Sequence, residues 1–149
     1  MKICVASSAG GHITELLQIK DVWKAYDHFY VVVEREDTKD FGRKEKSYFV
    51  DDTGRNAVSF IKNLYQSFKI VLKERPDVII TTGAGAALSA CFWAKLLGAK
   101  IVFIESFCRL DKASLSGKMI YPFADIFLVQ WKKLLKLYGS KAQYRGAVF

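Results

Sequence analysis

The stretch KICVASSAGGH, from Lys2 to His12, contains the pattern that decides the fold. Its apolar first part predicts a buried strand over Lys2 to Ser7. The two glycines after it predict a tight turn into a helix over Ile13 to Tyr26, where apolar residues recur at helical spacing. A buried strand that passes through a glycine-rich turn directly into a helix is typical of an α/β protein.

The same alternation continues along the rest of the chain. Further strands are predicted at His28–Val33, Tyr48–Val50, Val78–Thr81, Lys100–Glu105 and Ile126–Val129, and further helices at Arg55–Lys73, Gly85–Leu97, Ser116–Phe123 and Trp131–Tyr138. The charged segment Glu34–Lys46 is predicted to be a loop. Strands that are apolar on both faces and separated by helices imply a parallel sheet covered on two sides. We therefore expect one Rossmann-like domain over residues 1–149, with helices on both faces of the sheet.

The composition fits one globular domain and excludes a disordered chain, because 51% of the 149 residues are hydrophobic and 26% are charged. Three cysteines without a CxxC pair favour a reducing compartment, and they argue against a disulfide framework or a zinc site. The first residues are interrupted too early by Gly10 and His12 to form a signal peptide. The longest uncharged run, Val78 to Ala94, contains two glycines and is shorter than the roughly 20 apolar residues of a spanning helix. We expect a cytoplasmic protein.

Basic residues outnumber acidic ones by 23 to 15, which gives a net charge of +8. Residues 126–149 contain five of the basic residues and no acidic one. Such a stretch suits anionic lipid, an acidic partner or a phosphorylated substrate. Because no nucleic-acid-binding motif accompanies these charges, we do not expect nucleic acid as a partner. A solvated basic face without a dedicated ligand is the alternative.

Small and polar residues follow three of the predicted strands. Gly10, Gly11 and His12 follow the first strand, Gly83 and Gly85 follow the fourth, and Glu105 and Ser106 end or follow the fifth. Ligands of an open parallel sheet bind outside the carboxyl ends of its strands, near the switch point between the first and fourth strands. We therefore expect these residues to form one site.

The glycine-rich turn after the first strand is suited to a phosphate group. Gly10 and Gly11 allow the backbone to approach a ligand closely, and the following helix presents its positive end. A tight turn without a ligand is the alternative. His12 lies in the first helical turn, where the same dipole disfavours the charged imidazole. A neutral imidazole is what a general base requires, although a capping or packing histidine is equally compatible with the sequence.

Glu105 is the second candidate base, since a carboxylate at the end of a strand can accept a proton or hydrogen bonds from sugar hydroxyls. The alternative is a carboxylate that anchors the following loop. Arg109, Ser116 and Lys118 lie in the next polar stretch and are candidate contacts for an anion. The GAGAAL sequence at residues 83–88 lacks the third glycine of the dinucleotide fingerprint, and no P-loop sequence is present. We expect no NAD and no other cofactor.

Five blocks of the sequence carry a family resemblance: SSAGGH (7–12), TTGAGAAL (81–88), IESFCRLDKASLSGKMIYPFAD (104–125), FLVQW (127–131) and YRGAVF (144–149). They resemble the acceptor-side subunit of the two-piece UDP-GlcNAc transferase of the dolichol pathway. The resemblance is closer still to the bacterial PssD-like proteins of capsule and exopolysaccharide clusters. A wider resemblance is to the amino-terminal half of MurG, although Ile104 stands where MurG has a histidine.

This resemblance implies one half of an inverting GT-B glycosyltransferase that is peripheral on the inner face of the cell membrane and uses no metal. The implied acceptor is a polyprenyl-pyrophosphate-linked sugar, and a second subunit would hold most of the UDP-sugar donor. His12 or Glu105 would deprotonate the acceptor hydroxyl. Substrate contacts would come from Gly10, Gly11, Gly83, Gly85, Ser106, Arg109, Ser116 and Lys118. The alternative is a non-catalytic scaffold that recruits and stabilises the catalytic subunit.

Two surfaces are expected to make further contacts. The resemblance implies that the carboxyl end, with Tyr144, Val148 and Phe149, belongs to the surface that docks the second subunit. Seven large apolar residues exceed what one small core needs, and we expect them to contribute to binding of an anionic membrane: Leu16, Leu17, Trp23, Phe60, Leu64, Phe68 and Trp93.

Overall fold

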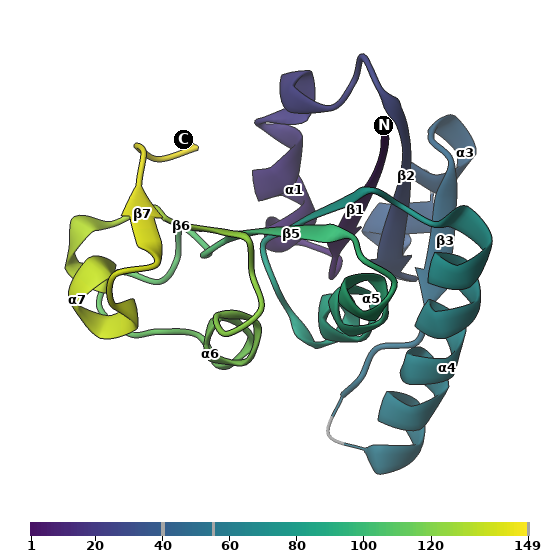
Figure 1. Cartoon of the computed structure of the whole chain (residues 1–149). Coiled ribbons are helices and arrows are strands. Elements are labelled where there is room, and N and C mark those ends of the chain that lie inside the picture. Colours follow the sequence, from purple (N-terminus) through teal and green to yellow (C-terminus); the bar gives the residue numbers. More distant parts are fainter. Residues whose placement is uncertain (40, 55, 149) are drawn as a thin grey trace.

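The computed structural model describes residues 1–39, 41–54 and 56–148 (Figure 1). Within these residues seven parallel strands form one sheet in the order β3-β2-β1-β4-β5-β6-β7. The strands are β1 (Lys2–Ser7), β2 (Asp27–Val33), β3 (Ser47–Val50), β4 (Val78–Thr81), β5 (Lys100–Ile104), β6 (Ile126–Val129) and β7 (Ala142–Tyr144). The chain leaves β1 towards β2 on one side and reaches β4 on the other, so the predicted switch point is present.

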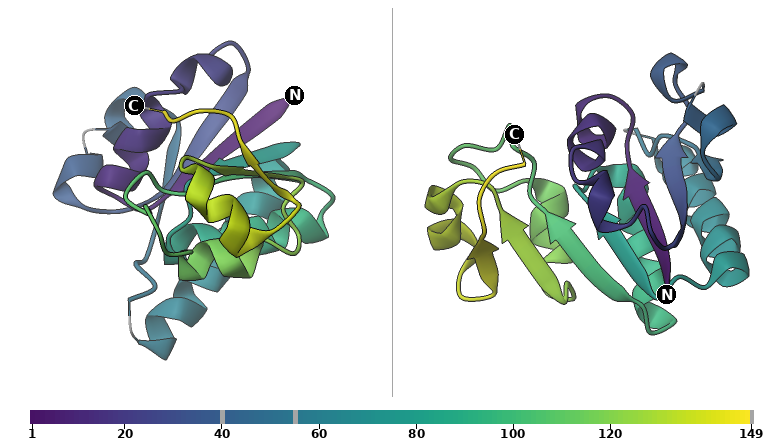
Figure 2. Two further views of the ribbon diagram at one scale, coloured as in Figure 1. Left: turned by 90° about the vertical axis from the view of Figure 1, so that its left-hand side faces the viewer. Right: turned by 90° about the horizontal axis from the view of Figure 1, so that it is seen from above.

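Helices cover both faces of this sheet, as predicted. They are α1 (Gly11–Leu17), α2 (Glu36–Lys39), α3 (Phe41–Lys44), α4 (Ala57–Glu74), α5 (Gly85–Leu96), α6 (Leu115–Ile120) and α7 (Leu135–Tyr138), with 3₁₀ turns η1 (Lys20–Val22) and η2 (Lys132–Leu134). Helix α1 lies on one face, whereas α4, α5 and α6 lie on the other (Figures 1 and 2). Among the described residues, no helix combines the length and the apolar character needed to cross a membrane.

The long helix α4 has clear sequence boundaries. The Asn56 side chain accepts a hydrogen bond from the Val58 backbone N–H at 2.9 Å, which caps the first turn. At the other end Arg75 adopts a left-handed conformation with φ 46°, and Pro76 follows. Proline has no backbone N–H to continue the helix, so the chain turns there into β4.

The two faces of the sheet bury cores of different size. On the face of α4 to α7, alternate residues of the strands, such as Phe29, Phe103 and Phe127, form the larger cluster. On the other face, Val5 and Tyr30 belong to a smaller cluster with residues of α1 and with Trp23, which directly follows η1. The alternation shows that side chains point to opposite faces along each strand, as in any buried parallel sheet.

The membrane expectation for Leu16 and Trp23 was wrong, because both side chains are fully buried in this smaller cluster. The Trp23 indole donates to the Tyr30 hydroxyl at 3.0 Å. Leu17, Leu64, Phe68 and Trp93 are partly buried, and of the seven only Phe60 is exposed. The helix predicted over Ile13 to Tyr26 was too long, because α1 ends at Leu17 and the 3₁₀ turn η1 then returns Trp23 to the core.

Two further differences concern short elements. The predicted loop 34–46 contains the short helices α2 and α3, and strand β7 was not predicted. Strand β7 has three residues, of which only Ala142 is buried, so it carries no alternating apolar pattern. It pairs with β6 through its backbone, with Phe127 opposite Ala142.

Candidate functional site

The structure brings the three predicted segments together at one edge of the sheet. Strands β1, β4 and β5 are neighbours, with Ala6 opposite Thr81 and Thr81 opposite Phe103. Their carboxyl ends therefore point to the same edge. The Thr82 hydroxyl, just after β4, donates to the backbone carbonyl of His12 at 3.2 Å, which fixes the two loops to each other.

His12 is half-buried at the start of α1. Burial lowers the pKa of its imidazole below the ordinary value of 6.5, and the positive charge of Arg109 lowers it further. The carboxylates of Glu15 and Glu105 act in the opposite direction, because they stabilise the charged ring. Its Nδ1 atom is buried and has no hydrogen-bond partner among the described residues. Nδ1 is therefore closed off from a substrate hydroxyl.

Glu105 occupies a closed environment. Its side chain is fully buried, and Oε1 accepts a hydrogen bond from the Ser106 backbone N–H at 3.0 Å. Oε2 accepts from the Ser114 backbone N–H at 3.1 Å, from the Ser114 hydroxyl at 3.0 Å and from the Tyr138 hydroxyl. These contacts favour the alternative in which the carboxylate anchors the loop between Ser106 and Ser114.

Tyr138 and Gly117 complete this environment. Burial, together with the hydrogen bond to Glu105, raises the pKa of the Tyr138 hydroxyl, so the tyrosine remains a proton donor. Gly117 passes so closely that a Cβ atom there would lie 2.8 Å from Glu105 Oε2 and closer still to the Tyr138 hydroxyl. Only glycine fits this position without displacing the network.

A second buried carboxylate, Glu15, was not predicted. It lies one turn after His12 and accepts hydrogen bonds from the Ser106 hydroxyl at 3.2 Å and from the Phe107 backbone N–H at 2.6 Å. The Gln130 side-chain amide also donates to Glu15 and, at 3.0 Å, to the backbone carbonyl of Glu105. Gln130 directly follows β6, just as the predicted site residues follow β1, β4 and β5. Its position in the sequence was therefore a signal that could have identified it.

The predicted glycines fall into two groups. Gly10 has φ 76°, and a Cβ atom on Gly10 or Gly11 would have open space around it. Gly83 has φ 92°, and a Cβ atom there would lie 2.6 Å from the Ser116 hydroxyl. Gly85 is packed more closely still, against the Thr53 hydroxyl. The glycines after β1 therefore border open space, whereas those after β4 allow close packing within the chain.

The remaining predicted substrate-binding residues differ in their exposure and in their contacts. Ser106 is buried and turned towards Glu15, and the Ser116 hydroxyl is 3.3 Å from that of Ser114. Arg109 is exposed near His12. Lys118 is exposed on α6, and among the described residues no hydrogen bond or ion pair joins it to the other predicted side chains. The described residues also contain no group of three or more His, Cys, Asp and Glu side chains that could hold a metal.

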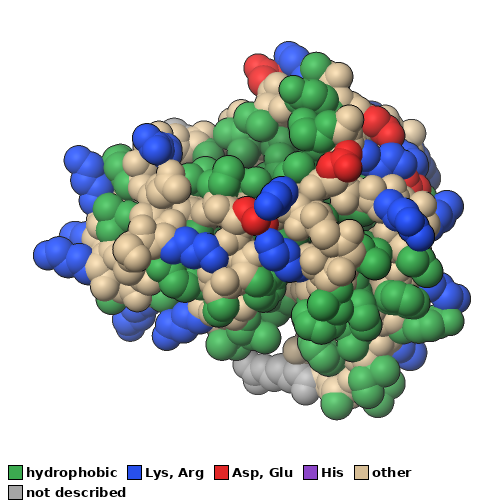
Figure 3. All heavy atoms as spheres, in the orientation of Figure 1, with side chains coloured by type: hydrophobic (Ala, Val, Ile, Leu, Met, Phe, Trp, Pro, Cys, Tyr) green, Lys and Arg blue, Asp and Glu red, His purple; other side chains and the backbone are tan. Residues whose placement is uncertain are grey.

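The carboxyl end borders an open hollow of about 610 Å³ beside this edge. Its lining residues are Leu110, Gln130, Trp131, Lys132, Lys133, Tyr144 and Ala147. Tyr144 is exposed with the Lys132 ammonium 5.5 Å from its ring centre, and the Val148 backbone N–H donates to the Gln130 side-chain oxygen at 2.9 Å. Phe149 lies outside the described residues. Lysine and arginine side chains gather over this part of the molecule, at the left of Figure 3.

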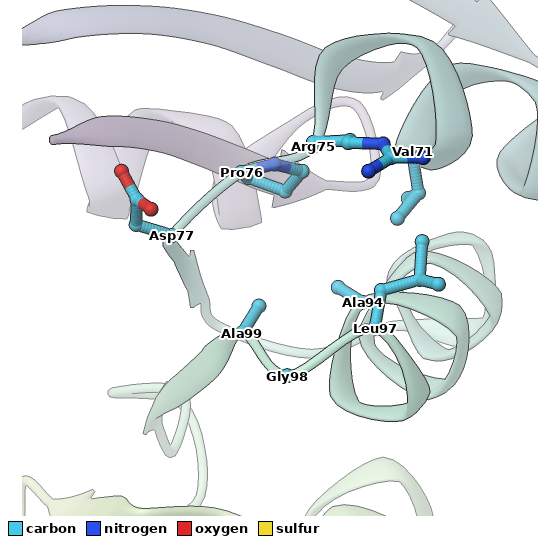
Figure 4. A pocket seen from close by; sticks show the side chains of 8 residues that line it. All are labelled: Val71, Arg75, Pro76, Asp77, Ala94, Leu97, Gly98 and Ala99. Carbon is cyan, nitrogen blue, oxygen red and sulfur yellow. The ribbon is translucent and has the colours of Figure 1, made fainter.

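Another hollow, of about 300 Å³, lies at the opposite edge of the sheet, where β4 begins (Figure 4). The ends of α4 and α5 border it, and Arg75 and Asp77 are its charged residues. The Asp77 carboxylate already accepts a hydrogen bond from the Lys2 backbone N–H at 2.6 Å. This hollow contains none of the predicted site residues.

Solved structures with the same fold include MurG and a UDP-GlcNAc 2-epimerase. The chain is similar to MurG from Acinetobacter baumannii, with a TM-score of 0.75 and 14% identity, over 99% of this chain and 45% of that one. It is also similar to the UDP-GlcNAc 2-epimerase from Methanocaldococcus jannaschii, with a TM-score of 0.77 and 16% identity, over 99% of this chain and 47% of that one. The chain thus spans less than half the length of these structures, and the likeness confirms the Rossmann-like half-domain.

Sequence comparison gives closer relatives. The human protein named UDP-N-acetylglucosamine transferase subunit ALG14 is 26% identical over 99% of this chain and 83% of its own length. The protein of the same name from Schizosaccharomyces pombe is 47% identical over 49% of this chain and 37% of its own length. The family described as "Oligosaccharide biosynthesis protein Alg14 like" matches residues 49–148. The chain therefore belongs to the Alg14-like family of oligosaccharide biosynthesis proteins.

Proposed function

We propose that this chain is the acceptor-side subunit of a two-component inverting glycosyltransferase, which transfers a sugar from a UDP-sugar to a polyprenyl-pyrophosphate-linked acceptor. One observation carries the proposal: the human relative, which aligns with 99% of this chain over 83% of its own length, is named a UDP-N-acetylglucosamine transferase subunit. A GT-B active site lies in the cleft between two such halves. As a subunit, this chain would supply one half, and a partner chain would supply the nucleotide-sugar half.

In this reaction the oxygen of the acceptor hydroxyl attacks the anomeric carbon of the donor sugar. The bond from that carbon to the UDP oxygen breaks, and its electrons leave with UDP. His12 Nε2 takes the proton of the attacking hydroxyl, and a neutral ring is the form that can do so. Gly10 and Gly11 border the open space in which the phosphates of the acceptor would lie. We assign Glu105 the role of a positioning residue, because its oxygens are already occupied by donors of the chain.

The test is transfer by a reconstituted pair. The chain is co-purified with a candidate second subunit, chosen as a neighbouring reading frame that resembles the carboxyl half of a GT-B enzyme. Transfer of labelled GlcNAc from UDP-GlcNAc to a prenyl-pyrophosphate-linked sugar is then measured. Activity of the pair, with none for either chain alone, is expected. Full transfer by the second subunit alone would overturn the proposal.

The scaffold alternative is also supported by an observation. His12 Nδ1 has no partner among the described residues, whereas a histidine base usually donates this N–H to an orienting group. A scaffold would recruit and stabilise the catalytic subunit without supplying a base. In that case His12→Ala would leave the turnover of the purified pair unchanged, whereas the proposed base requires its loss.

The carboxyl end is the proposed surface for the second subunit. Tyr144 is exposed, and Val148 is tied to Gln130, which in turn contacts Glu15 and the backbone of Glu105. Burial of the apolar tip at residues 147–149 would contribute about 3 to 5 kcal/mol before ordering costs, or roughly two to three decades of affinity. Deletion of these residues should leave a folded domain that no longer captures its partner. Undiminished recovery of the pair would place the interface elsewhere.

A membrane surface is the last proposed partner. Val58, Ile61, Leu115 and Met119 on α4 and α6 are at least half-exposed, and Figure 3 shows apolar side chains gathered over the lower part of the molecule. Apolar patches of this kind mark interaction sites, and the net positive charge adds attraction to anionic lipid. We propose peripheral binding at the inner face of the cell membrane. Flotation with anionic liposomes should occur at low salt and weaken at high salt, and absence of binding at low salt would overturn this.

The resemblance to PssD-like proteins supports a capsule or exopolysaccharide setting. In that setting the acceptor carries a bacterial polyprenol, and the product is a polysaccharide precursor. The reconstituted pair should then prefer an acceptor of the bacterial type over a dolichol-linked one. Preference for the dolichol-linked acceptor would contradict this part of the proposal.

A further inference from the structure

A third hollow, of about 270 Å³, lies between α4, α5 and α6. The side chains that line it are Phe60, Leu64, Leu88, Ser89, Phe92, Met119 and Phe123. All of them are apolar except Ser89, whose hydroxyl oxygen is buried and has no hydrogen-bond partner among the described residues. Such a lining can hold hydrocarbon but offers few polar contacts to orient a sugar or a nucleotide.

The rim of this hollow is unusually accessible. Phe60 on α4, Phe92 on α5 and Met119 on α6 are 43%, 47% and 50% exposed, so each of the three helices presents a large apolar side chain to solvent. Burying such side chains is favourable by about 25 cal/mol for each Å² of apolar surface removed from water. The hollow is therefore suited to an occupant that covers these side chains.

The hollow shares two helices with the polar site. Helix α5 begins beside Gly83, and its next turn contributes Leu88 and Ser89 to the hollow. Helix α6 carries Ser116, which contacts Gly83, and three residues later Met119 on the rim, a step of about 4.5 Å along the axis. On α6, a polar residue of the site and an apolar residue of the hollow are therefore separated by about one helical turn.

We infer that this hollow binds the part of the prenyl chain adjacent to the pyrophosphate of the lipid-linked acceptor. The inference rests on the proposed function, since it takes the acceptor to be a prenyl pyrophosphate. Such a ligand has a phosphate head, which suits the polar site, and a branched hydrocarbon chain, which suits the neighbouring apolar hollow. Lys118, exposed next to Met119, adds a positive charge near the boundary between head and chain. Membrane phospholipid is the competing occupant.

The test measures binding of farnesyl pyrophosphate and of inorganic pyrophosphate to the intact chain by calorimetry. Methyl NMR of Leu64 and Leu88 reports on the hollow in the same samples. Farnesyl pyrophosphate should bind at least tenfold tighter than pyrophosphate and should shift both methyl signals, whereas pyrophosphate alone should leave them in place. Equal affinities, or unchanged methyl signals, would overturn the inference. Equal shifts with a short-chain phosphatidylglycerol would also overturn it, in favour of membrane phospholipid.

Matched variants distinguish binding in this hollow from binding to exposed apolar surface in general. Phe92→Gln with Met119→Gln makes the rim polar without a change of charge, and both positions are exposed enough to tolerate it. The control, Leu96→Gln with Leu97→Gln, changes two exposed positions at the other end of α5, which are 64% and 50% exposed. The rim variant should lose the tenfold gain and keep pyrophosphate binding, whereas the control should keep both. A rim variant that retains the gain would contradict the inference. Failure of the proposed function appears separately, as a wild-type pair that transfers no sugar although the binding difference persists.

Discussion

The loops after β1 and β5 lie at the same edge of the sheet and are built in opposite ways. The first contains Gly10 and Gly11, which border open space, and a half-buried His12 whose Nδ1 has no partner among the described residues. In the second, Glu105 is fully buried and accepts hydrogen bonds from two backbone N–H groups and two hydroxyls. A group that exchanges protons with a ligand has to be reachable, whereas an enclosed carboxylate holds its surroundings in place. The difference favours His12 as the base and Glu105 as its structural support.

The largest expected effect is on stability, at the closed loop. Glu105→Ala removes the acceptor that the buried donors of Ser106, Ser114 and Tyr138 share. A buried donor that loses its acceptor costs about 1 to 3 kcal/mol, so the loss of several such hydrogen bonds is expected to cost about 3 to 5 kcal/mol in total. Urea unfolding of the purified chain should show a loss of this size in the free energy of unfolding. A loss below about 1 kcal/mol would mean that water or rearrangement replaces these contacts.

The conservative variant Glu105→Gln separates support from catalysis. Glutamine keeps the size of the side chain but replaces one acceptor oxygen with a donor, so it disturbs the contacts with Ser114 and Tyr138. If Glu105 is a positioning residue, the loss of transfer should follow the loss of stability and should diminish at lower temperature. Loss of transfer of a hundredfold or more in a fully stable variant would instead make Glu105 the base.

At the open loop the expected effect is on turnover. His12→Ala removes the proposed proton acceptor, and general base catalysis contributes about 10²- to 10⁴-fold to rate. We expect kcat of the reconstituted pair to fall by at least a hundredfold, or about 2.7 kcal/mol in activation free energy. The free energy of unfolding should change by less than about 1 kcal/mol, because the ring is only half-buried and its Nδ1 makes no hydrogen bond to the described residues. Recovery of the pair during co-purification serves as the control for assembly, and unchanged kcat with an intact pair would favour the scaffold.

A smaller effect is expected for Tyr138→Phe. This change removes one of the hydroxyls that donate to Glu105 and leaves the backbone N–H groups of Ser106 and Ser114 in place. Loss of one hydrogen bond to a charged group costs about 1.5 to 3 kcal/mol. Urea unfolding should therefore place this variant between wild type and Glu105→Ala. A loss equal to that of Glu105→Ala would show that the tyrosine, rather than the carboxylate, organises the loop.

The sequence predicted the open loop better than the closed one, and the reason is physical. A glycine pair after a buried strand imposes a local turn, and local conformation depends on neighbouring residues. The partners of Glu105 lie nine and 33 positions further along the chain, at Ser114 and Tyr138, and no local pattern joins them. The same holds for Glu15. In the sequence it is an ordinary polar residue of α1, and its partners Phe107 and Gln130 lie far along the chain.

The strands show the same dependence on local pattern. The boundaries of β1, β4 and β6 agree with the predicted ranges, because each is an apolar run that ends at a change in composition. Strand β7 was missed, since its place in the sheet is set by pairing with β6 rather than by its own residues. Trp23 was assigned to the surface because the sequence does not show the 3₁₀ turn that returns it to the core.

The smallest expected effect is the response of the open loop to pH. Burial, assisted by Arg109, lowers the pKa of His12 below 6.5, so the folded chain binds this proton less readily than the unfolded chain does. As the pH falls from 6.5 through the lowered pKa, the unfolded state takes up more protons and the contribution of His12 to stability decreases. The transfer rate should hold its plateau below pH 6.5 and fall only when the ring becomes charged. Titration of the His12 ring proton by NMR gives the pKa directly, and Arg109→Gln should raise it and move the acid limb of the rate profile to higher pH. A His12 pKa above 6.5 in the wild-type chain would show that Glu15 and Glu105 outweigh burial, and would place this histidine within the closed network rather than at the open loop.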